Sequence, residues 1–132
     1  MKELLEETTS QNIYWDSENK IVHGVLIANL TTLEDAIENI DAQERIKNKM
    51  NREKTRVLID MSSVSEISKE ARNYFSNERT ASIQRATALY INSVVGRVIG
   101  NFFMGINKPL TPTKIFTDKK AAIKWLHAYK DE

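Results

Sequence analysis

The chain has 132 residues, a formal net charge of +1 at pH 7 and no cysteine. This length predicts a single domain over residues 1–132. A net charge so close to zero provides no overall field for nucleic acid or an anionic membrane, so neither is expected as a partner. The absence of cysteine excludes disulfides, thiol nucleophiles and thiolate metal sites. The start of the chain lacks a signal-peptide core and no stretch is apolar enough to span a bilayer, so we expect a cytoplasmic protein.

Strand and helix signals alternate along the first half of the chain. Residues 12–30 predict a hairpin, because apolar residues with period two flank the turn formers of the sequence DSEN. Residues 31–54 predict a helix that begins with a capping box, formed either by Thr31 with Glu34 or by Thr32 with Asp35. The sequence TRVLID at residues 55–60 is apolar in its middle, which is typical of a central strand covered on both faces.

The second half continues the alternation. Residues 67–75 carry apolar side chains at helical spacing, and residues 86–91 predict a short strand. A helix is expected near residues 93–104, a strand at residues 113–117, and a final helix that Thr117 and Asp118 open. This order predicts an α/β fold with a mixed, mostly parallel sheet of four to five strands, an N-terminal hairpin and about four helices.

Polar residues gather where the central strand ends and the next helix begins, namely Asp60, Ser62, Ser63, Ser65, Ser68 and Lys69. In an open α/β sheet, ligands bind at the carboxyl ends of the strands, and a helix N-terminus favours an anion. This serine-rich turn is therefore a candidate anion- or partner-binding site. The structural alternative is that Ser68 only caps the helix and that the other serines only form the turn.

Two short motifs carry a family resemblance. The sequence LIDMSSVSEISKEA resembles the strand–turn–helix signature of STAS domains, the fold of the SpoIIAA-like anti-anti-sigma factors, and Asp60, Met61, Ser62 and Val64 match its first half. The sequence FTDKKAAIKWL is similar to the ending common among SpoIIAA-like proteins. The resemblance implies a non-enzymatic regulatory domain that binds a protein around the helix beginning near Ser68.

The chain departs from the family pattern at the phosphorylation site. In phosphoswitch members of the family, the serine at the start of the helix accepts the phosphate, and the resemblance places Lys69 at that position. Ser68 falls on the aspartate of the family, and Glu70 and Ala71 replace its Ser-Gly. The phosphoswitch is therefore not expected here, except in a weak form in which Ser68 accepts phosphate in a shifted register.

The helix expected near residues 93–104 is apolar over more than half of its circumference. Gly96 and Gly100 lie four residues apart on it, and because each glycine destabilises a helix relative to alanine, we expect a packing reason for them. The surplus apolar surface suits a dimer contact, a ligand cavity or simply the core. The candidate interface or apolar-ligand residues are Val95, Ile99, Phe102 and Phe103.

Three classes of function stay open. The leading hypothesis is a protein-interaction domain that forms a homodimer and binds an unidentified protein partner. The alternative is a carrier of a small hydrophobic or lipid-like ligand. An enzyme has the weakest support, because Asp60 has no recognisable acid–base or nucleophilic partner. His23 and His127 are too few ligands for a metal, so we expect neither a metal nor a cofactor.

Overall fold

The computed structural model describes residues 2–130, without the side chain of Phe102. In chain order its elements are β1 (Lys2–Glu7), β2 (Gln11–Asp16), β3 (Ile21–Leu26), β4 (Leu30–Thr31), α1 (Leu33–Lys49), β5 (Thr55–Asp60), β6 (Glu66–Ile67), α2 (Lys69–Ser76), α3 (Glu78–Ala81), β7 (Gln84–Tyr90), α4 (Val94–Phe102), the π-helical turn η1 (Phe103–Asn107), β8 (Thr113–Phe116) and α5 (Lys119–Leu126). Within this part of the chain, no helix has the length and apolar character needed to cross a membrane.

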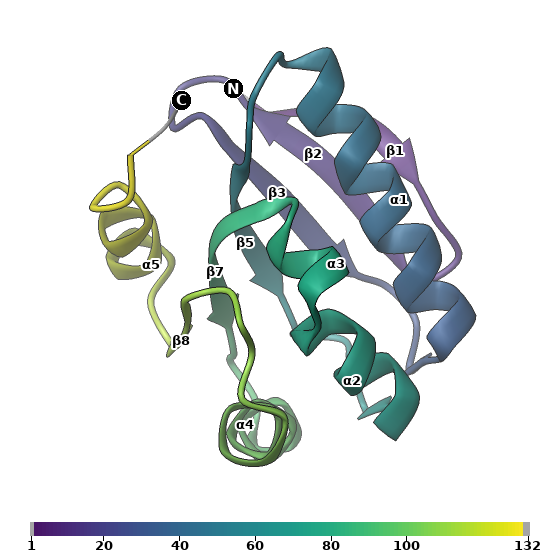
Figure 1. Ribbon diagram of the computed structural model, residues 1–132. Coiled ribbons are helices and arrows are strands. Elements are labelled where there is room, and N and C mark those ends of the chain that lie inside the picture. The colour runs from purple at the N-terminus through teal and green to yellow at the C-terminus, as the bar shows by residue number, and fades with distance from the viewer. Residues whose placement is uncertain (1, 131–132) are drawn as a thin grey trace.

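One six-stranded sheet organises the domain, in the order β1-β2-β3-β5-β7-β8. The strands β1, β2 and β3 pair antiparallel, whereas β3, β5, β7 and β8 pair in parallel. Figure 1 shows α1, α2 and α3 along one face of the sheet and α5 beside β7 and β8. The short strands β4 and β6 form a separate parallel pair. The predicted mixed, mostly parallel α/β fold with an N-terminal hairpin is confirmed.

β1 is the strand of the six-stranded sheet that the sequence does not predict, and the short β4 and β6 are not predicted either. Its sequence KELLEE has only two apolar residues, and four of its six residues are exposed. It lies at the edge of the sheet, where a strand needs pairing on one side only and where charged residues discourage pairing with other chains. β1 therefore brings the sheet to six strands, one more than the upper end of the expected range.

β5 lies in the middle of the sheet and is buried along its whole length, as predicted. Val57 and Ile59 pack with residues of α1, α2 and α4 on one face, while Leu58 packs with Ala122 and Leu126 of α5 on the other. Because successive side chains of a strand point to opposite faces, burying all of them needs a helical layer on each side. The domain accordingly has three layers.

Arg56 joins separate segments on the α5 side of the sheet. It is buried in β5, and its guanidinium donates to the carbonyl oxygens of Tyr129 at 3.1 Å, Asn19 at 3.1 Å and Lys20 at 3.2 Å. A buried charge is tolerated when it is hydrogen-bonded in this way. Arg56 thereby holds the segment that follows α5 against the turn between β2 and β3.

The helices begin where the sequence indicates. Thr32 and Asp35 form the capping box of α1, with Thr32 Oγ1 accepting a hydrogen bond from the Asp35 amide at 3.2 Å, so the second of the two predicted pairs is the correct one. Asp118 caps α5 by accepting from the Lys120 amide at 3.0 Å. Each cap of this kind stabilises its helix by about 1 kcal/mol.

Two glycines allow α4 to lie close to the ends of β7 and β8. A Cβ atom at Gly100 would lie 2.7 Å from Ile91 Cδ1 and 3.1 Å from Ile115 Cδ1, and one at Gly96 would lie 3.0 Å from Ile91 Cγ2. These separations are shorter than the roughly 3.5–4.0 Å of an ordinary carbon–carbon contact. The packing reason expected for the Gly-x-x-x-Gly sequence is confirmed.

His23 is buried in β3, and neither of its ring nitrogens has a hydrogen-bond partner among residues 2–130. The ring lies beside that of Tyr14, with 6.2 Å between the centroids. Burial is the main cause that lowers the pKa of His23 to about 4, and the charges of Lys2 and Lys119 add to it while nearby carboxylates oppose it. The folded protein therefore keeps this imidazole neutral at pH 7.

Gly100→Ala is expected to lower the free energy of unfolding by about 1 kcal/mol. Overpacking a close contact costs about 1–3 kcal/mol, which outweighs the gain of roughly 1 kcal/mol that alanine brings to a helix. Gly105→Ala is the matched control, because a Cβ atom there meets nothing within 4 Å, and it should be neutral or stabilising. Denaturant unfolding measures both variants, and equal effects would contradict the packing role of Gly100.

The stability of the protein should fall on acidification because of His23. Its pKa is about 4 in the folded state and about 6.5 when unfolded, so the unfolded chain takes up the proton first as the pH falls through this window. The free energy of unfolding should drop by about 1.5 kcal/mol more between pH 6.5 and pH 5 in the wild type than in His23→Leu. An acid response of His23→Leu identical to that of the wild type would show that His23 contributes nothing.

Candidate functional site

Asp60 ends β5 at the carboxyl edge of the sheet and is buried. Its carboxylate accepts hydrogen bonds from the amide of Ser62 at 3.0 Å and from the hydroxyl of the same residue. It also pairs with Lys119 Nζ at 3.2 Å, and this ammonium lies 4.9 Å from the ring centroid of Tyr90. Asp60 therefore holds both the serine-rich turn and the start of α5.

The charge of Asp60 bears on what the serine-rich turn can bind. Burial raises the pKa of this carboxyl, but the hydrogen bonds from Ser62 and the contact with Lys119 outweigh that effect, so the net result is a lowered pKa. The carboxylate is accordingly ionised at neutral pH. Because the carboxylate is paired with Lys119 Nζ, the two charges compensate each other, and this cation is not left free for a bound anion.

The backbone of the turn is largely occupied by internal hydrogen bonds. The amides of Ser65 and Ser68 donate to the carbonyl oxygens of Asn29 and Thr31, at 2.9 and 3.0 Å, next to the pairing of β4 with β6. Ser68 is half-buried, and the other serines of the turn are exposed: Ser62, Ser63 and Ser65. An anion would need free amides that point together, and these bonds remove two of them.

Ser68 is the N-cap of α2, and its Oγ accepts a hydrogen bond from the Ala71 amide at 3.1 Å. The predicted capping role of Ser68 is confirmed, and any further role of this hydroxyl stays a prediction. Lys69, the first residue of α2, is exposed. The anion-binding and partner-binding roles of the turn both stay predictions, and the bonds at Ser65 and Ser68 leave fewer amides free for an anion.

The structure separates the candidate residues of the helix expected near residues 93–104. Val95 is exposed on the outer side of α4. Ile99 and Phe103 instead line an internal cavity and pack on the core. The side chain of Phe102 lies outside the described part of the structure. The candidate residues therefore differ in their surroundings, because Val95 is in solvent while Ile99 and Phe103 border the cavity.

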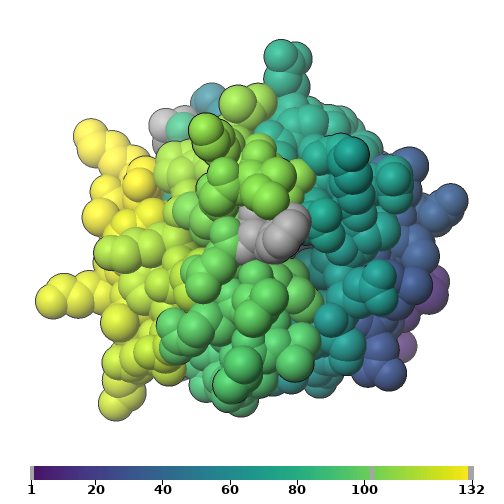
Figure 2. Space-filling view, turned by 90° about the horizontal axis from the view of Figure 1, so that it is seen from below, coloured from purple at the N-terminus to yellow at the C-terminus, as the bar shows by residue number. Residues whose placement is uncertain are grey.

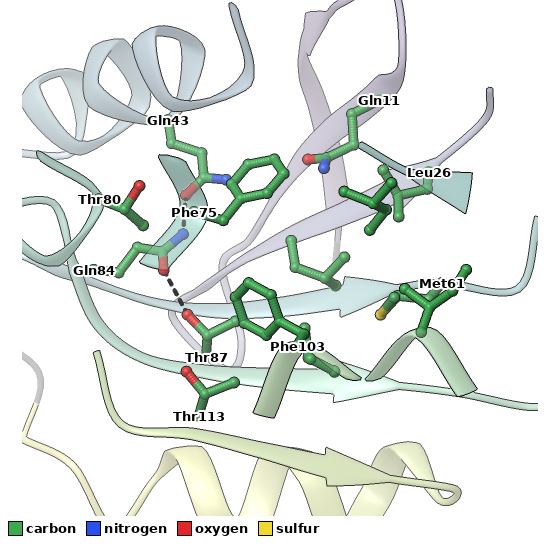
Figure 3. Close-up of a pocket in the computed structure, with 14 residues that line it drawn as sticks. Gln11, Leu26, Gln43, Met61, Phe75, Thr80, Gln84, Thr87, Phe103 and Thr113 are labelled. Atoms are coloured by element: carbon green, nitrogen blue, oxygen red, sulfur yellow. Dashed lines mark hydrogen bonds between the residues drawn. The ribbon is translucent and has the colours of Figure 1, made fainter. Parts of the chain in front are cut away.

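The cavity lies between the sheet and the helices and measures about 60 Å³. Figure 3 shows Phe75 of α2 and Phe103 of η1 on either side of it. Its walls are mostly apolar and carry no charged side chain. The polar residues in the walls are Gln11, Gln43, Thr80, Gln84, Thr87 and Thr113.

Three polar side chains in the cavity wall form hydrogen bonds with one another. Gln84 Nε2 donates to Gln43 Oε1 at 2.9 Å, and Thr87 Oγ1 donates to Gln84 Oε1 at 2.6 Å, as the dashed lines in Figure 3 show. Buried hydrogen-bond networks of this kind rigidify the elements that they join. This network joins α1 to β7 across one end of the cavity.

Gln11 is buried with an acceptor that lacks a donor. It is 2% exposed, and its Oε1 has no hydrogen-bond partner among residues 2–130. Figure 3 shows the amide of Gln11 turned into the cavity, toward Phe75. A Cβ atom at Gly24 of β3 would lie only 2.5 Å from this oxygen. Because Gly24 has no side chain, the side-chain amide of Gln11 has room to lie next to β3.

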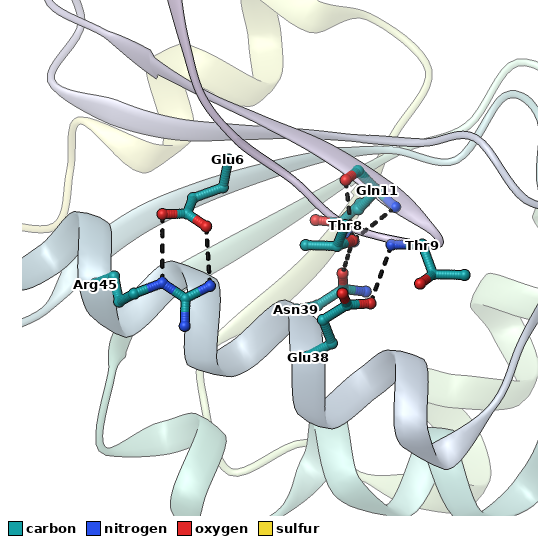
Figure 4. Close-up of polar contacts among 7 residues, drawn as sticks. All are labelled: Glu6, Thr8, Thr9, Gln11, Glu38, Asn39 and Arg45. Atoms are coloured by element: carbon teal, nitrogen blue, oxygen red, sulfur yellow. Dashed lines mark hydrogen bonds and ion pairs between the residues drawn. The ribbon is translucent and has the colours of Figure 1, made fainter.

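Polar contacts with α1 fix the chain just before Gln11, as Figure 4 shows. Thr8 Oγ1 donates to Asn39 Oδ1 at 2.6 Å and accepts from the backbone N–H of Gln11 at 3.0 Å. The amide of Thr9 donates to Glu38 Oε1 at 3.0 Å. These bonds hold the start of β2 against α1, so the backbone from which the Gln11 side chain extends has a fixed position.

The sequence analysis does not identify the polar residues of the cavity. One signal for them exists, because Gln43 follows Ala36 and Ile40 at helical spacing and so falls on the buried stripe of α1. A glutamine at such a position indicates a buried polar contact. Gln11 and Gln84 carry no comparable signal, because each stands at the first residue of its strand.

Within residues 2–130, no group of three or more histidine, aspartate or glutamate side chains is placed to hold a metal ion. The expectation that the protein uses no metal and no cofactor stays a prediction.

Comparison with solved structures supports the fold. An uncharacterized protein of the DUF3478 family from Shewanella loihica PV-4, with a SpoIIAA-like fold, aligns over 96% of this chain and 92% of its own, with a TM-score of 0.54 and 14% identity. The SpoIIAA-like fold implied by the sequence motifs is thereby confirmed. A protein with unknown function from Arthrobacter sp. FB24 aligns over 87% of this chain and 97% of its own at 26% identity, but its TM-score of 0.30 is too low to bear on the fold.

No curated protein matches the chain. A family model does match it, and the match covers residues 14–130, from the middle of β2 to the segment after α5. The family is described as a domain of unknown function, DUF7793. The match includes the serine-rich turn, α4 and most of the cavity wall, but begins after Gln11. The chain therefore belongs to the DUF7793 family.

Proposed function

We propose that this domain is a non-enzymatic cytoplasmic interaction module that binds a protein partner through the outward apolar face of α4 and the segment after it. We call this face the α4 surface, and its residues are Val94, Val95, Val98, Ile106 and Leu110. The SpoIIAA-like fold fits a regulatory role of this kind, and the absence of cysteine suits a reducing compartment.

The exposure of these aliphatic side chains is the observation that carries the proposal. Val94 is 80% exposed, Val98 59%, Ile106 64% and Leu110 60%. Figure 2 looks onto this part of the molecule, where α4, in green, lies between the teal α2 and the yellow C-terminal part of the chain. Exposed apolar residues that gather on one element are typical of protein contacts, whereas single ones are common anywhere on a surface.

The charges along this part of the chain indicate what the partner should carry. Between Glu78 and Asp118 the sequence holds no acidic residue, while Arg97 and Lys108 lie on α4 and just after η1. Both side chains are exposed. An apolar centre with a basic rim is complementary to a partner whose apolar residues are flanked by carboxylates.

The inner side of α4 lies beside the start of the serine-rich turn. A Cβ atom at Gly96, in the first turn of α4, would lie 3.7 Å from the carbonyl oxygen of Met61, the residue that follows β5. A second copy of this chain is the first partner to test, because the sequence analysis favours a homodimer.

Val94→Ser combined with Val98→Ser is expected to weaken binding to the partner at least tenfold. Removing two central apolar contacts costs an interface more than about 1 kcal/mol, whereas exposed side chains change the free energy of unfolding by only about 0.5 kcal/mol. Light scattering tests self-association, and affinity capture with cross-linking from the native cell identifies another partner for titration.

The matched control is Ile37→Ser, which removes a partly exposed aliphatic side chain from the outer side of α1. This variant should bind the partner as the wild type does. Equal binding by the wild type and the valine double variant, with both proteins folded, would place the contact elsewhere and refute the role of the α4 surface.

Ser68→Ala is expected to lower the free energy of unfolding by about 1 kcal/mol, because the variant loses the cap of α2. The affinity for the partner should stay within twofold of the wild type. Ser63→Ala, at an exposed position of the same turn, should change neither quantity. Denaturant unfolding and binding titration separate the two roles: a binding defect in Ser68→Ala without the loss of stability would indicate that the hydroxyl recognises the partner.

A further inference from the structure

We propose that the cavity between the sheet and the helices is a binding site for a small uncharged molecule with a short apolar body and an N–H or O–H donor group, such as a short alcohol or a primary amide. The donor group would bond to Gln11 Oε1, and the apolar body would lie against Phe75, Phe103 and Ile99. This inference is independent of the α4 surface, because none of the residues of that surface lines the cavity.

The need for a donor follows from the hydrogen bonds of the cavity wall. Gln43, Gln84 and Thr87 bond to one another, so the oxygens of both amides already accept a hydrogen bond. Gln11 Oε1 is instead buried without any donor. A buried acceptor without a partner is unfavourable, so a ligand that brings a donor to it gains more than one that brings only an acceptor.

The walls also determine the charge and the size of the ligand. No charged side chain lines the cavity, and an ion buried there would have no counter-charge, so the ligand is uncharged. The volume of about 60 Å³ is less than half of the roughly 150 Å³ cavity that accommodates benzene in another protein. A body of about four non-hydrogen atoms is therefore the appropriate size.

The acceptor is held in place before any ligand binds. The bonds of Thr8 and Thr9 to α1 fix the backbone at Gln11, and the missing side chain of Gly24 provides room for the amide. A preformed site of this kind loses little conformational entropy on binding. The site is thus built from both layers, because strands of the sheet and helices that cover it each contribute polar and apolar residues to its walls.

Two probes with the same carbon skeleton test this inference. 2-Propanol carries a hydroxyl donor, whereas acetone offers only an acceptor. Binding is followed by methyl-resolved NMR titration of the full chain at Ile59, Leu89 and Ile99. 2-Propanol should bind about tenfold more tightly than acetone, because only its hydroxyl can donate a hydrogen bond to the unpaired oxygen of Gln11. Dissociation constants of about millimolar size are expected for ligands this small.

Gln11→Leu should reduce the preference for 2-propanol to less than twofold, because it removes the acceptor and places an apolar side chain of similar size there. Asn12→Leu is the matched control, since it changes the next residue of β2, on the opposite face of the strand, and should keep the full preference. If Gln11→Leu does not fold, Gly24→Ala replaces it, because the added methyl would displace Gln11 Oε1 from its position.

Three outcomes overturn the inference. In the first, neither probe shifts the methyl signals of the folded wild type, which would mean that the cavity holds only water. In the second, acetone binds as tightly as 2-propanol or more tightly. In the third, a folded Gln11→Leu or Gly24→Ala protein keeps the tenfold preference, which would place the donor site elsewhere.

Discussion

The burial of β5 on both of its faces is the constraint on which the rest of the domain depends. A strand that exposes no side chain to water must have helices on each side of the sheet. The two charged residues of β5, Arg56 and Asp60, both face α5. Arg56 binds the carbonyl oxygen of Tyr129 beyond the end of α5, and Asp60 binds Lys119 at its start. One strand thus positions both ends of a helix that lies far from it in the sequence.

The two faces of the sheet are covered unequally, and the cavity is a consequence. One helix, α5, covers small side chains such as Ala86 and Ala88 on its face. On the other face α1, α2 and α4 meet over the sheet, and their side chains have to fill the space between helices that run in different directions. Packing of this kind is dense but leaves few voids, and those lined by polar groups bind water or a ligand. Gln11 and Gly24 lie at one such place.

The sequence predicts those parts of the fold that local signals determine. Periodicity identifies the β2–β3 hairpin, β5 and the main helices, and side-chain oxygens identify the caps at Thr32, Ser68 and Asp118. β1 is not predicted, because an edge strand is formed by its pairing and not by its pattern. The cavity is not predicted either, because it depends on where Gln11 and Gln84, far apart in the sequence, come to lie. Each of them alone resembles an ordinary surface glutamine.

α4 is the element in which the two candidate sites meet, and its glycines explain how. Because Gly96 and Gly100 let the helix lie close to the ends of β7 and β8, Ile99 reaches the cavity from one side of the helix while Val94 and Val98 stay in solvent on the other. A helix kept further away by larger residues would withdraw Ile99 from the cavity. The surplus apolar character of α4 is thus divided between a face that completes the interior and a face that the domain itself leaves uncovered.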